Sequence, residues 1–310
     1  MSVNKGLIQS LMIVPFITSA IVLAGVFGQD YLAYKTMLEN PDLFRSNSVL
    51  FLSVIKNFKS VDLLYFYLST TGIFVIAIIS FLFSRSYGFW VFLCVLTYPF
   101  VLASFFHAIR GSLASTLIVL GLVLICNNNR FRGLFFITIG LFFHISLGPY
   151  LILSFLGIVR SRIFLICLLL CLFCIIIFGH HTLPNYFVDS KLFFGSKNYI
   201  KYPFVTFSLF LCLKSFKRES FKIPKIKQRF FENSYKLGLM LGSFMSILSI
   251  YFPIDSVDRF SQPFIIFILL LIIASSFEIS TVRRRIALFC SLSTLGFLLT
   301  VVAVSSWSSV

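Results

Sequence analysis

Apolar runs long enough to cross a bilayer recur along the chain and are separated by short polar segments. A transmembrane helix needs about 20 consecutive apolar residues, whereas the strands of a membrane β-barrel would alternate apolar and polar residues over about ten positions. The pattern therefore predicts an all-α, polytopic membrane protein with about eleven transmembrane helices, within a range of roughly 10–12. The expected spans are residues 7–27, 62–84, 87–106, 110–126, 131–146, 148–159, 163–179, 201–214, 234–252, 262–280 and 286–304.

Three of these spans differ from the rest. The first run, 7–27, is followed by no clear cleavage site, so we expect it to stay as an uncleaved anchor. Spans 148–159 and 201–214 are short, because a helix of that length reaches only about 18–21 Å. Either could be a tilted half-span or a re-entrant segment.

The few charges of this 310-residue chain, 12% of its residues, are sorted by side of the membrane. With Lys5 in the cytoplasm, 17 of the 26 basic residues and three of the ten acids fall in the cytoplasmic segments. That excess follows the positive-inside rule and explains the net charge of +16 without nucleic acid. We therefore predict one transmembrane domain, 1–310, with external loops at 28–61 and 179–200 and a basic cytoplasmic loop at 214–233.

Polar residues that topology does not explain gather on the outer face. Arg110 begins a span in FFHAIRGSLAS, and Arg259 stands just ahead of a span that starts at Ser261, with Ser261 as its cap. Both arginines are thereby expected at helix N-termini, where free N–H groups and the helix dipole favour anions. The guanidinium fork also matches phosphate oxygens, so the pair would suit a diphosphate. The alternative is that each arginine only extends to the interface.

Aromatic and acidic residues on the same face would suit sugars. Asp30, Tyr31 and Tyr34 close the first span in GQDYLAY, where rings stack on sugar faces and the acid binds hydroxyls or takes a proton. The alternative for the tyrosines is an interfacial aromatic belt. His107, which shares the face of Arg110, and Asp258 complete the sugar-binding candidates, with Tyr31 and Tyr34.

His144, in LFFHISLGP, lies at the outer end of a predicted span. It is a candidate base or hydrogen-bond partner, and the alternative is a packing histidine. Asp30, His144 and Arg110 are thus the catalytic candidates. We expect no metal and no other cofactor, because His180 and His181 are adjacent and no acid nearby has ligand spacing.

The segments GQDYLAYKTML, FFHAIRGSLASTLIVLGL, GLFFITIGLFFHISLGPYLIL and SVDRFSQPFIIFILL together resemble the EpsG family, which belongs with the Wzy-type polysaccharide polymerases. The family pattern is Asp-Tyr-x-x-Tyr, Ile-Arg-Gln-x-x-Ala, Phe-His and a late Arg. Residues 30–34, Arg110, His144 and Arg259 match these elements in order. Ile109, Arg110 and Ala114 match the second element. Gly111 stands where Gln is usual, which leaves open whether a polar contact is lost or met elsewhere.

The resemblance implies a GT-C-like membrane glycosyltransferase at the outer face of the bacterial inner membrane. It would move a growing glycan from undecaprenyl diphosphate to the non-reducing end of a lipid-linked repeat unit. Membrane lipid, a chain-length regulator and a flippase are its expected partners. Three alternatives stay open: a flippase or transporter for lipid-linked oligosaccharide, an O-antigen ligase-like enzyme, and a non-catalytic scaffold.

Overall fold

The computed structural model describes residues 14, 17, 29–39, 49–98, 101–102, 104–105, 108–144, 147–148, 150–151, 198–219, 223–251 and 254–278. Within these ranges every regular element of the chain is helical. The helices are α2 (Gln29–Glu39), α3 (Val49–Ile55), α4 (Val61–Phe83), α5 (Gly88–Leu96), α7 (Ile109–Cys126), α8 (Arg130–Phe143), α11 (Asn198–Glu219), α12 (Lys225–Tyr251) and α13 (Ile254–Glu278). The prediction of an all-α chain is confirmed for this part of the chain.

Three described helices are long and apolar enough to cross a membrane. They are Val61–Phe83, Ile109–Cys126 and the Ser261–Glu278 part of α13, and each lies within two residues of a predicted span. In the last two, 83% and 89% of the apolar window is buried inside the protein, against 56% for Val61–Phe83. The chain is therefore a membrane-embedded protein with α7 and α13 at its centre.

Other predicted spans differ from the structure in length. The short span 201–214 lies inside α11, which continues through Pro203 for 22 residues. In the same way α12 extends span 234–252 toward the basic segment, to 27 residues. By contrast, α5 covers only the first half of 87–106, and its C-cap is Thr97. Spans 7–27, 148–159, 163–179 and 286–304 lie outside the described residues for all or most of their length, so the total of eleven stays a prediction.

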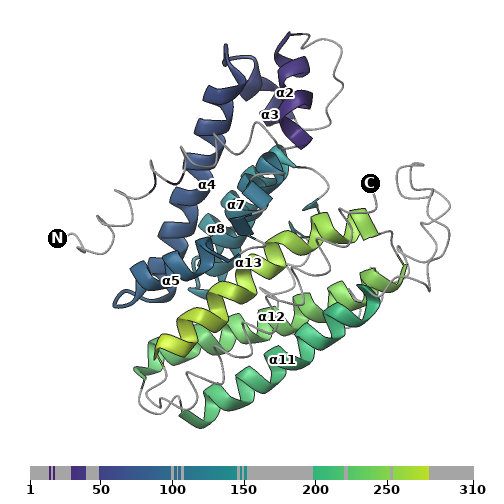
Figure 1. Ribbon diagram of the computed structural model, residues 1–310. Helices are drawn as coiled ribbons and strands as arrows, with labels where there is room; N and C mark the ends of the chain where they lie inside the picture. The colour runs from purple at the N-terminus through teal and green to yellow at the C-terminus, as the bar shows by residue number, and fades with distance from the viewer. Residues whose placement is uncertain are drawn as a thin grey trace.

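The segment 28–61, which is predicted to be an external loop, contains two helices. Both α2 and α3 lie in it, and α2 packs against α4 whereas α3 packs against α8 (Figure 1). Ser60 ends this loop and caps α4, because its Oγ accepts a hydrogen bond from the N–H of Asp62 at 3.2 Å. Helices α2 and α3 therefore lie over one end of the bundle.

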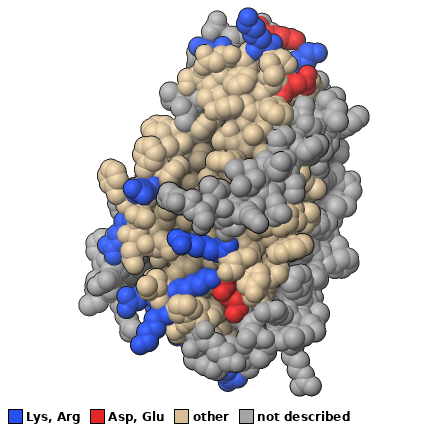
Figure 2. All heavy atoms as spheres, turned by 90° about the vertical axis from the view of Figure 1, so that its left-hand side faces the viewer, with Lys and Arg blue, Asp and Glu red and all other residues tan. Residues whose placement is uncertain are grey.

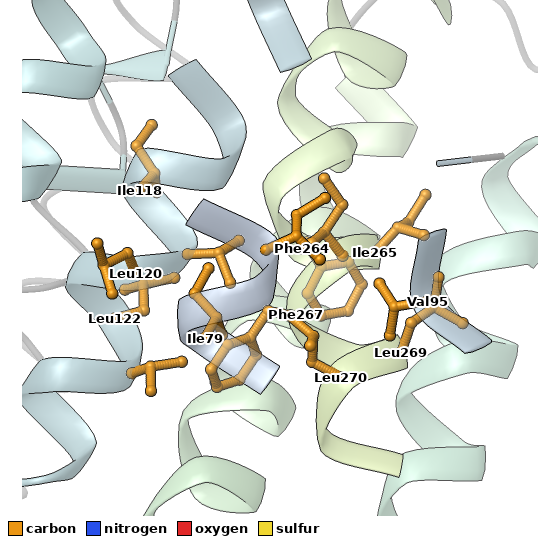
Figure 3. Close-up of a cluster of buried hydrophobic side chains, with 14 of the residues drawn as sticks. Ile79, Val95, Ile118, Leu120, Leu122, Phe264, Ile265, Phe267, Leu269 and Leu270 are labelled. Carbon is orange, nitrogen blue, oxygen red and sulfur yellow. The ribbon is translucent and has the colours of Figure 1, made fainter. Parts of the chain in front are cut away.

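Helix α13 joins two groups of helices. In Figure 1 α11, α12 and α13 lie side by side, and α13 also contacts α4, α5 and α7 from the other group. Figure 3 shows the resulting core, in which Phe264 and Phe267 of α13 lie between Ile79 of α4 and Val95 of α5. All four side chains are fully buried or nearly so. This packing holds α13 against both α4 and α5.

Small residues bring the backbones of α7 and α8 into direct contact. A Cβ atom added at Gly121 would lie 2.5 Å from the carbonyl oxygen of Gly133, and one at Gly133 would lie 2.6 Å from the oxygen of Gly121. One added at Gly140 would lie 2.9 Å from the oxygen of Ala114. Such close approach is typical of membrane helix pairs with small residues at the interface. It sets an antiparallel register that continues to Gly111 and His144.

The two ends of the bundle differ in charge. The basic end carries Arg85, Arg130, Arg132, Lys217, Arg218, Lys225, Lys227 and Arg229. There Glu278 accepts from Lys227 and, at 2.7 Å, from the hydroxyl of Ser84, which joins the ends of α12, α13 and α4. Figure 2 shows blue side chains gathered toward this end, while blue and red lie together at the top. The separation matches the charge sorting expected from the sequence.

Candidate functional site

The opposite end is formed by α2, α3, the first turns of α4 and α7 and the last turn of α8, and we call it the aromatic end. Arg110 is the second residue of α7, as predicted, and its N-cap Ala108 makes no side-chain cap. The Cζ atom of Arg110 lies 4.9 Å from the ring centroid of Phe51, which comes from α3. The guanidinium thus rests on an aromatic face at a helix N-terminus, where it is partly buried.

Three tyrosine rings extend that contact, and we call Tyr31, Tyr34, Phe51 and Tyr65 the aromatic cluster. Tyr34 lies 5.4 Å from Phe51 and 5.8 Å from Tyr65, and Tyr31 lies 5.7 Å from Tyr65, between ring centroids. Tyr34 is only 3% exposed, whereas Tyr31 is partly exposed. Tyr34 therefore packs behind Phe51, and Tyr31 is the tyrosine of the pair that reaches the surface.

Asp62 is a carboxylate at this end that the sequence reasoning missed. The hydroxyl of Tyr31 donates to its Oδ1 at 2.9 Å. This bond, with burial and the nearby negative charge as smaller causes, raises the pKa of Tyr31. The sequence pattern marks Asp62 only as the first residue of a predicted span, because its partner lies 31 positions earlier and reaches it only through the packing of α2 on α4.

His144 lies across from the first turn of α7. It is the C-cap of α8 and is partly buried. A Cβ atom added at Gly111 would lie 3.6 Å from Cδ2 of His144, in ordinary contact. The α7–α8 register thus brings His144 beside the residue that follows Arg110, so two of the predicted catalytic residues share one end of one helix pair.

Gln262 of α13 packs against the first turns of α7, so a third helix contributes to the same region as Arg110 and His144. Its Oε1 would lie 3.3 Å from a Cβ atom at Gly111. Its Nε2 donates to Oγ of Ser112 at 3.0 Å, and its Oε1 accepts from Oγ of Ser115 at 3.2 Å. The amide is therefore held at both ends by two serines one turn apart on α7. No sequence signal separated Gln262 from its neighbours in SQPF.

Arg259 differs from expectation in its position on the helix. Because α13 begins at Ile254, Arg259 is its sixth residue, and Ser261 is a buried interior residue and not a cap. The prediction that Arg259 sits at a helix N-terminus is wrong: the polar segment before the apolar run is helical too. Pro263, also inside α13, has no N–H to give to the carbonyl of Arg259.

For the remaining candidate residues, the structure describes the backbone alone or does not describe the residue. Asp30 lies in α2, and Asp258 and Arg259 lie in α13, at positions where the helix is described and the side chain is not. His107 lies outside the described residues, as do His180 and His181. Across the described ranges, no group of three or more His, Cys, Asp or Glu residues lies together as a metal site would require.

Comparison with known proteins gives one finding. The model of the EpsG family matches residues 7–309, which is nearly the whole chain. No curated protein and no solved structure gave a match. Membership of this family suggests a polysaccharide polymerase-like role and implies a lipid-linked substrate. On a match of this length, the chain belongs to the EpsG family.

Proposed function

We propose that the protein is a polysaccharide polymerase of the inner membrane that uses undecaprenyl diphosphate-linked donors. It transfers the growing glycan, an O-antigen or exopolysaccharide, to the non-reducing end of a lipid-linked repeat unit. The aromatic end faces the periplasm and holds the reaction, and the N-terminus and basic end face the cytoplasm. The family match supports the class of reaction, and the charge difference between the two ends supports this orientation.

The observation that carries the proposal is the placement of Arg110. The guanidinium of Arg110 belongs to the first turn of α7 and lies on the ring of Phe51. The N-terminus of a helix favours anions, so a phosphate would meet both the arginine and the helix end there. Arg110 binds the donor diphosphate and stabilises the charge that develops on it as it leaves. Arg259 contacts the same diphosphate from α13. Its contribution is the charge and fork of its side chain, since no helix terminus assists it there.

Glycosyl transfer needs one proton acceptor. The acceptor hydroxyl oxygen attacks the anomeric carbon, the bond from that carbon to the diphosphate oxygen breaks, and the diphosphate keeps the electron pair. Asp30 or His144 takes the hydroxyl proton. His144 is supported by its position beside Gly111, one residue from Arg110. A direct displacement of this kind inverts the anomeric carbon and needs no metal ion.

In this proposal, sugars bind at the exposed side of the aromatic cluster. Tyr31, which is partly exposed, offers a ring face, and Asp62 offers carboxylate oxygens for sugar hydroxyls. Tyr34 acts from behind, by holding Phe51 and Tyr65 in place. His107 and Asp258 are further sugar contacts in this proposal. A GT-C-like architecture and association with a flippase and a chain-length regulator are part of the same proposal.

The test in cells uses a strain that lacks the gene and is complemented with wild type, Arg110→Ala, Arg110→Lys or Arg132→Ala. Arg132 is the matched control, because it is an exposed arginine at the basic end. Surface polysaccharide is separated on a gel and the protein is quantified in the membrane. We expect single-repeat or core-length material with Arg110→Ala and full ladders with Arg132→Ala. Failure of Arg110→Lys as well indicates bidentate phosphate binding.

The same strain separates the alternatives. A polymerase deletion leaves single repeat units on the cell surface, whereas a flippase deletion leaves none there. A ligase deletion leaves polymer attached to its lipid diphosphate. Persistence of the full ladder after deletion would refute the proposal, and a full ladder with Arg110→Ala would remove Arg110 from the site. A scaffold would tolerate all the arginine substitutions.

A further inference from the structure

Gln262 joins the two helices that carry the proposed diphosphate-binding arginines. Its side chain is 7% exposed, and both ends of its amide are engaged by α7. Ser112 follows Arg110 by two residues, and Gln262 follows Arg259 by three, less than one helical turn in each case. A movement of α13 along or around its axis would break one or both of these hydrogen bonds.

We infer that Gln262 is a positioning residue that sets the spacing between Arg110 and Arg259, so that the pair fits a diphosphate in preference to a monophosphate. This inference rests on the proposed function. Two hydrogen bonds to serines one turn apart resist both sliding and rotation of α13 against α7, which one bond would not do. The spacing of the two phosphate contacts is thereby fixed before the substrate arrives.

An amide matches the two serines. The hydroxyl of Ser115 donates a hydrogen bond, and the hydroxyl oxygen of Ser112 accepts one. The side-chain amide of Gln262 provides a carbonyl acceptor for the first and an N–H donor for the second. Ser112 in turn donates to the backbone ahead of α7, where the carbonyl oxygen of Ala108 lies 2.9 Å and that of Ser104 lies 2.7 Å from its Oγ. A carboxylate at 262 would leave Ser112 without its donor, and an aliphatic side chain would leave both serines unmatched.

The absence of a side chain at Gly111 leaves room for the amide of Gln262 beside the start of α7. A Cβ atom at 111 would lie only 3.3 Å from Oε1 of Gln262, a tight contact that would require the amide to shift by a few tenths of an ångström. The usual Gln of the related sequence pattern is absent at 111, and an amide from α13 lies against that position instead. In this chain the polar contact at the start of α7 is met by Gln262.

The test measures a ratio of affinities on the purified full-length protein in lipid nanodiscs. Farnesyl diphosphate and farnesyl monophosphate are titrated against wild type, Gln262→Ala, Ser115→Ala and Tyr235→Phe. Tyr235→Phe is the matched control. It removes another buried hydrogen bond of α13, the 2.8 Å contact between Tyr235 of α12 and Ser275 of α13, which lies far from the aromatic end. A ratio does not change when part of the protein is merely unfolded, so it reports positioning and not stability.

We expect wild type and Tyr235→Phe to share one preference for the diphosphate. Gln262→Ala should lower that preference by about tenfold or more, the value of one charge-assisted hydrogen bond. Ser115→Ala should lower it less, and it serves if Gln262→Ala fails to fold. An unchanged ratio in both variants would overturn the role of Gln262 alone. Absence of any diphosphate preference in wild type would overturn the proposed diphosphate site, and this inference with it.

Discussion

Tyr31 donates its phenolic hydrogen to Asp62 across 2.9 Å, and so links α2 to the first turn of α4. The same tyrosine ring lies 5.7 Å from that of Tyr65, which is fully buried. One side chain therefore combines a packed ring with a polar group at the surface. Asp62 is exposed, so its carboxylate is accessible to a sugar in the proposed reaction.

Asp62→Ala should raise KM for the acceptor repeat unit by about tenfold, because a hydrogen bond to a charged group contributes roughly 1.5–3 kcal/mol. The effect on kcat should be smaller, since Asp62 binds the acceptor in this account and does not take its proton. Cell-free polymerisation with purified lipid-linked units measures both constants. Glu39→Ala is the control, as an exposed acid of α2 at the same end. An unchanged KM for Asp62→Ala would argue against sugar binding there.

Alkaline titration should show the Tyr31–Asp62 bond directly. The bond raises the pKa of Tyr31 above its ordinary value of 10.0. Between that value and the raised pKa, the folded protein keeps a proton that the unfolded chain releases, so folding stability falls as pH rises through this interval and is unaffected below it. Phenolate absorbance of wild type minus Tyr31→Phe gives the midpoint. Asp62→Asn should move this midpoint down, and an identical midpoint would contradict the assignment.

The α7–α8 contact should be intolerant of a single methyl group. Gly121→Ala places a Cβ atom 2.5 Å from a backbone oxygen, so the helices must separate. We expect a loss of about 1–3 kcal/mol in stability and a lower polymerisation rate, since the register that places His144 beside Gly111 is disturbed. Gly238→Ala in α12 is the control, because its nearest atom would be at 3.7 Å. That variant should gain about 0.5–1 kcal/mol. Thermal midpoints and rates measure both.

Glu278→Gln tests whether the basic end contributes to stability alone or also to the reaction. It removes the charge that Lys227 contacts while leaving an acceptor for Ser84. We expect a lower thermal midpoint, because the partly buried ammonium of Lys227 loses its counter-charge, and an unchanged polymerisation rate per folded molecule. A loss of rate without a loss of stability would show that this end takes part in the reaction.

Hydropathy located the apolar part of the helices and not the helix ends. The span starting at 262 was placed correctly, yet α13 begins at Ile254, because IDSVDRF is polar and also compatible with helix. Its acids near the N-terminus suit the helix dipole. The same error hid the start of α12 at Lys225. Membrane boundaries follow from burial in lipid, whereas helix boundaries follow from local capping and propensity.

Single residues with a clear chemical role were easier to find than their partners. Arg110 and His144 were visible because a charge and an imidazole stand out in apolar sequence. Phe51, Asp62 and Gln262 were not, because their importance comes from contacts with residues at least 31 positions away. Phe and Gln are also too common in this setting to signal anything alone. Tertiary packing, and no local pattern, makes them part of the site.

The contact between Gly121 and Gly133 limits the route by which a substrate can enter from the bilayer. With the two backbones this close, no gap between α7 and α8 along that contact can admit an isoprenoid chain. Arg110 lies at the end of the closed contact. In the proposed reaction, a lipid diphosphate therefore does not reach Arg110 by passing between α7 and α8 along this contact, and its tail lies outside that stretch of the helix pair.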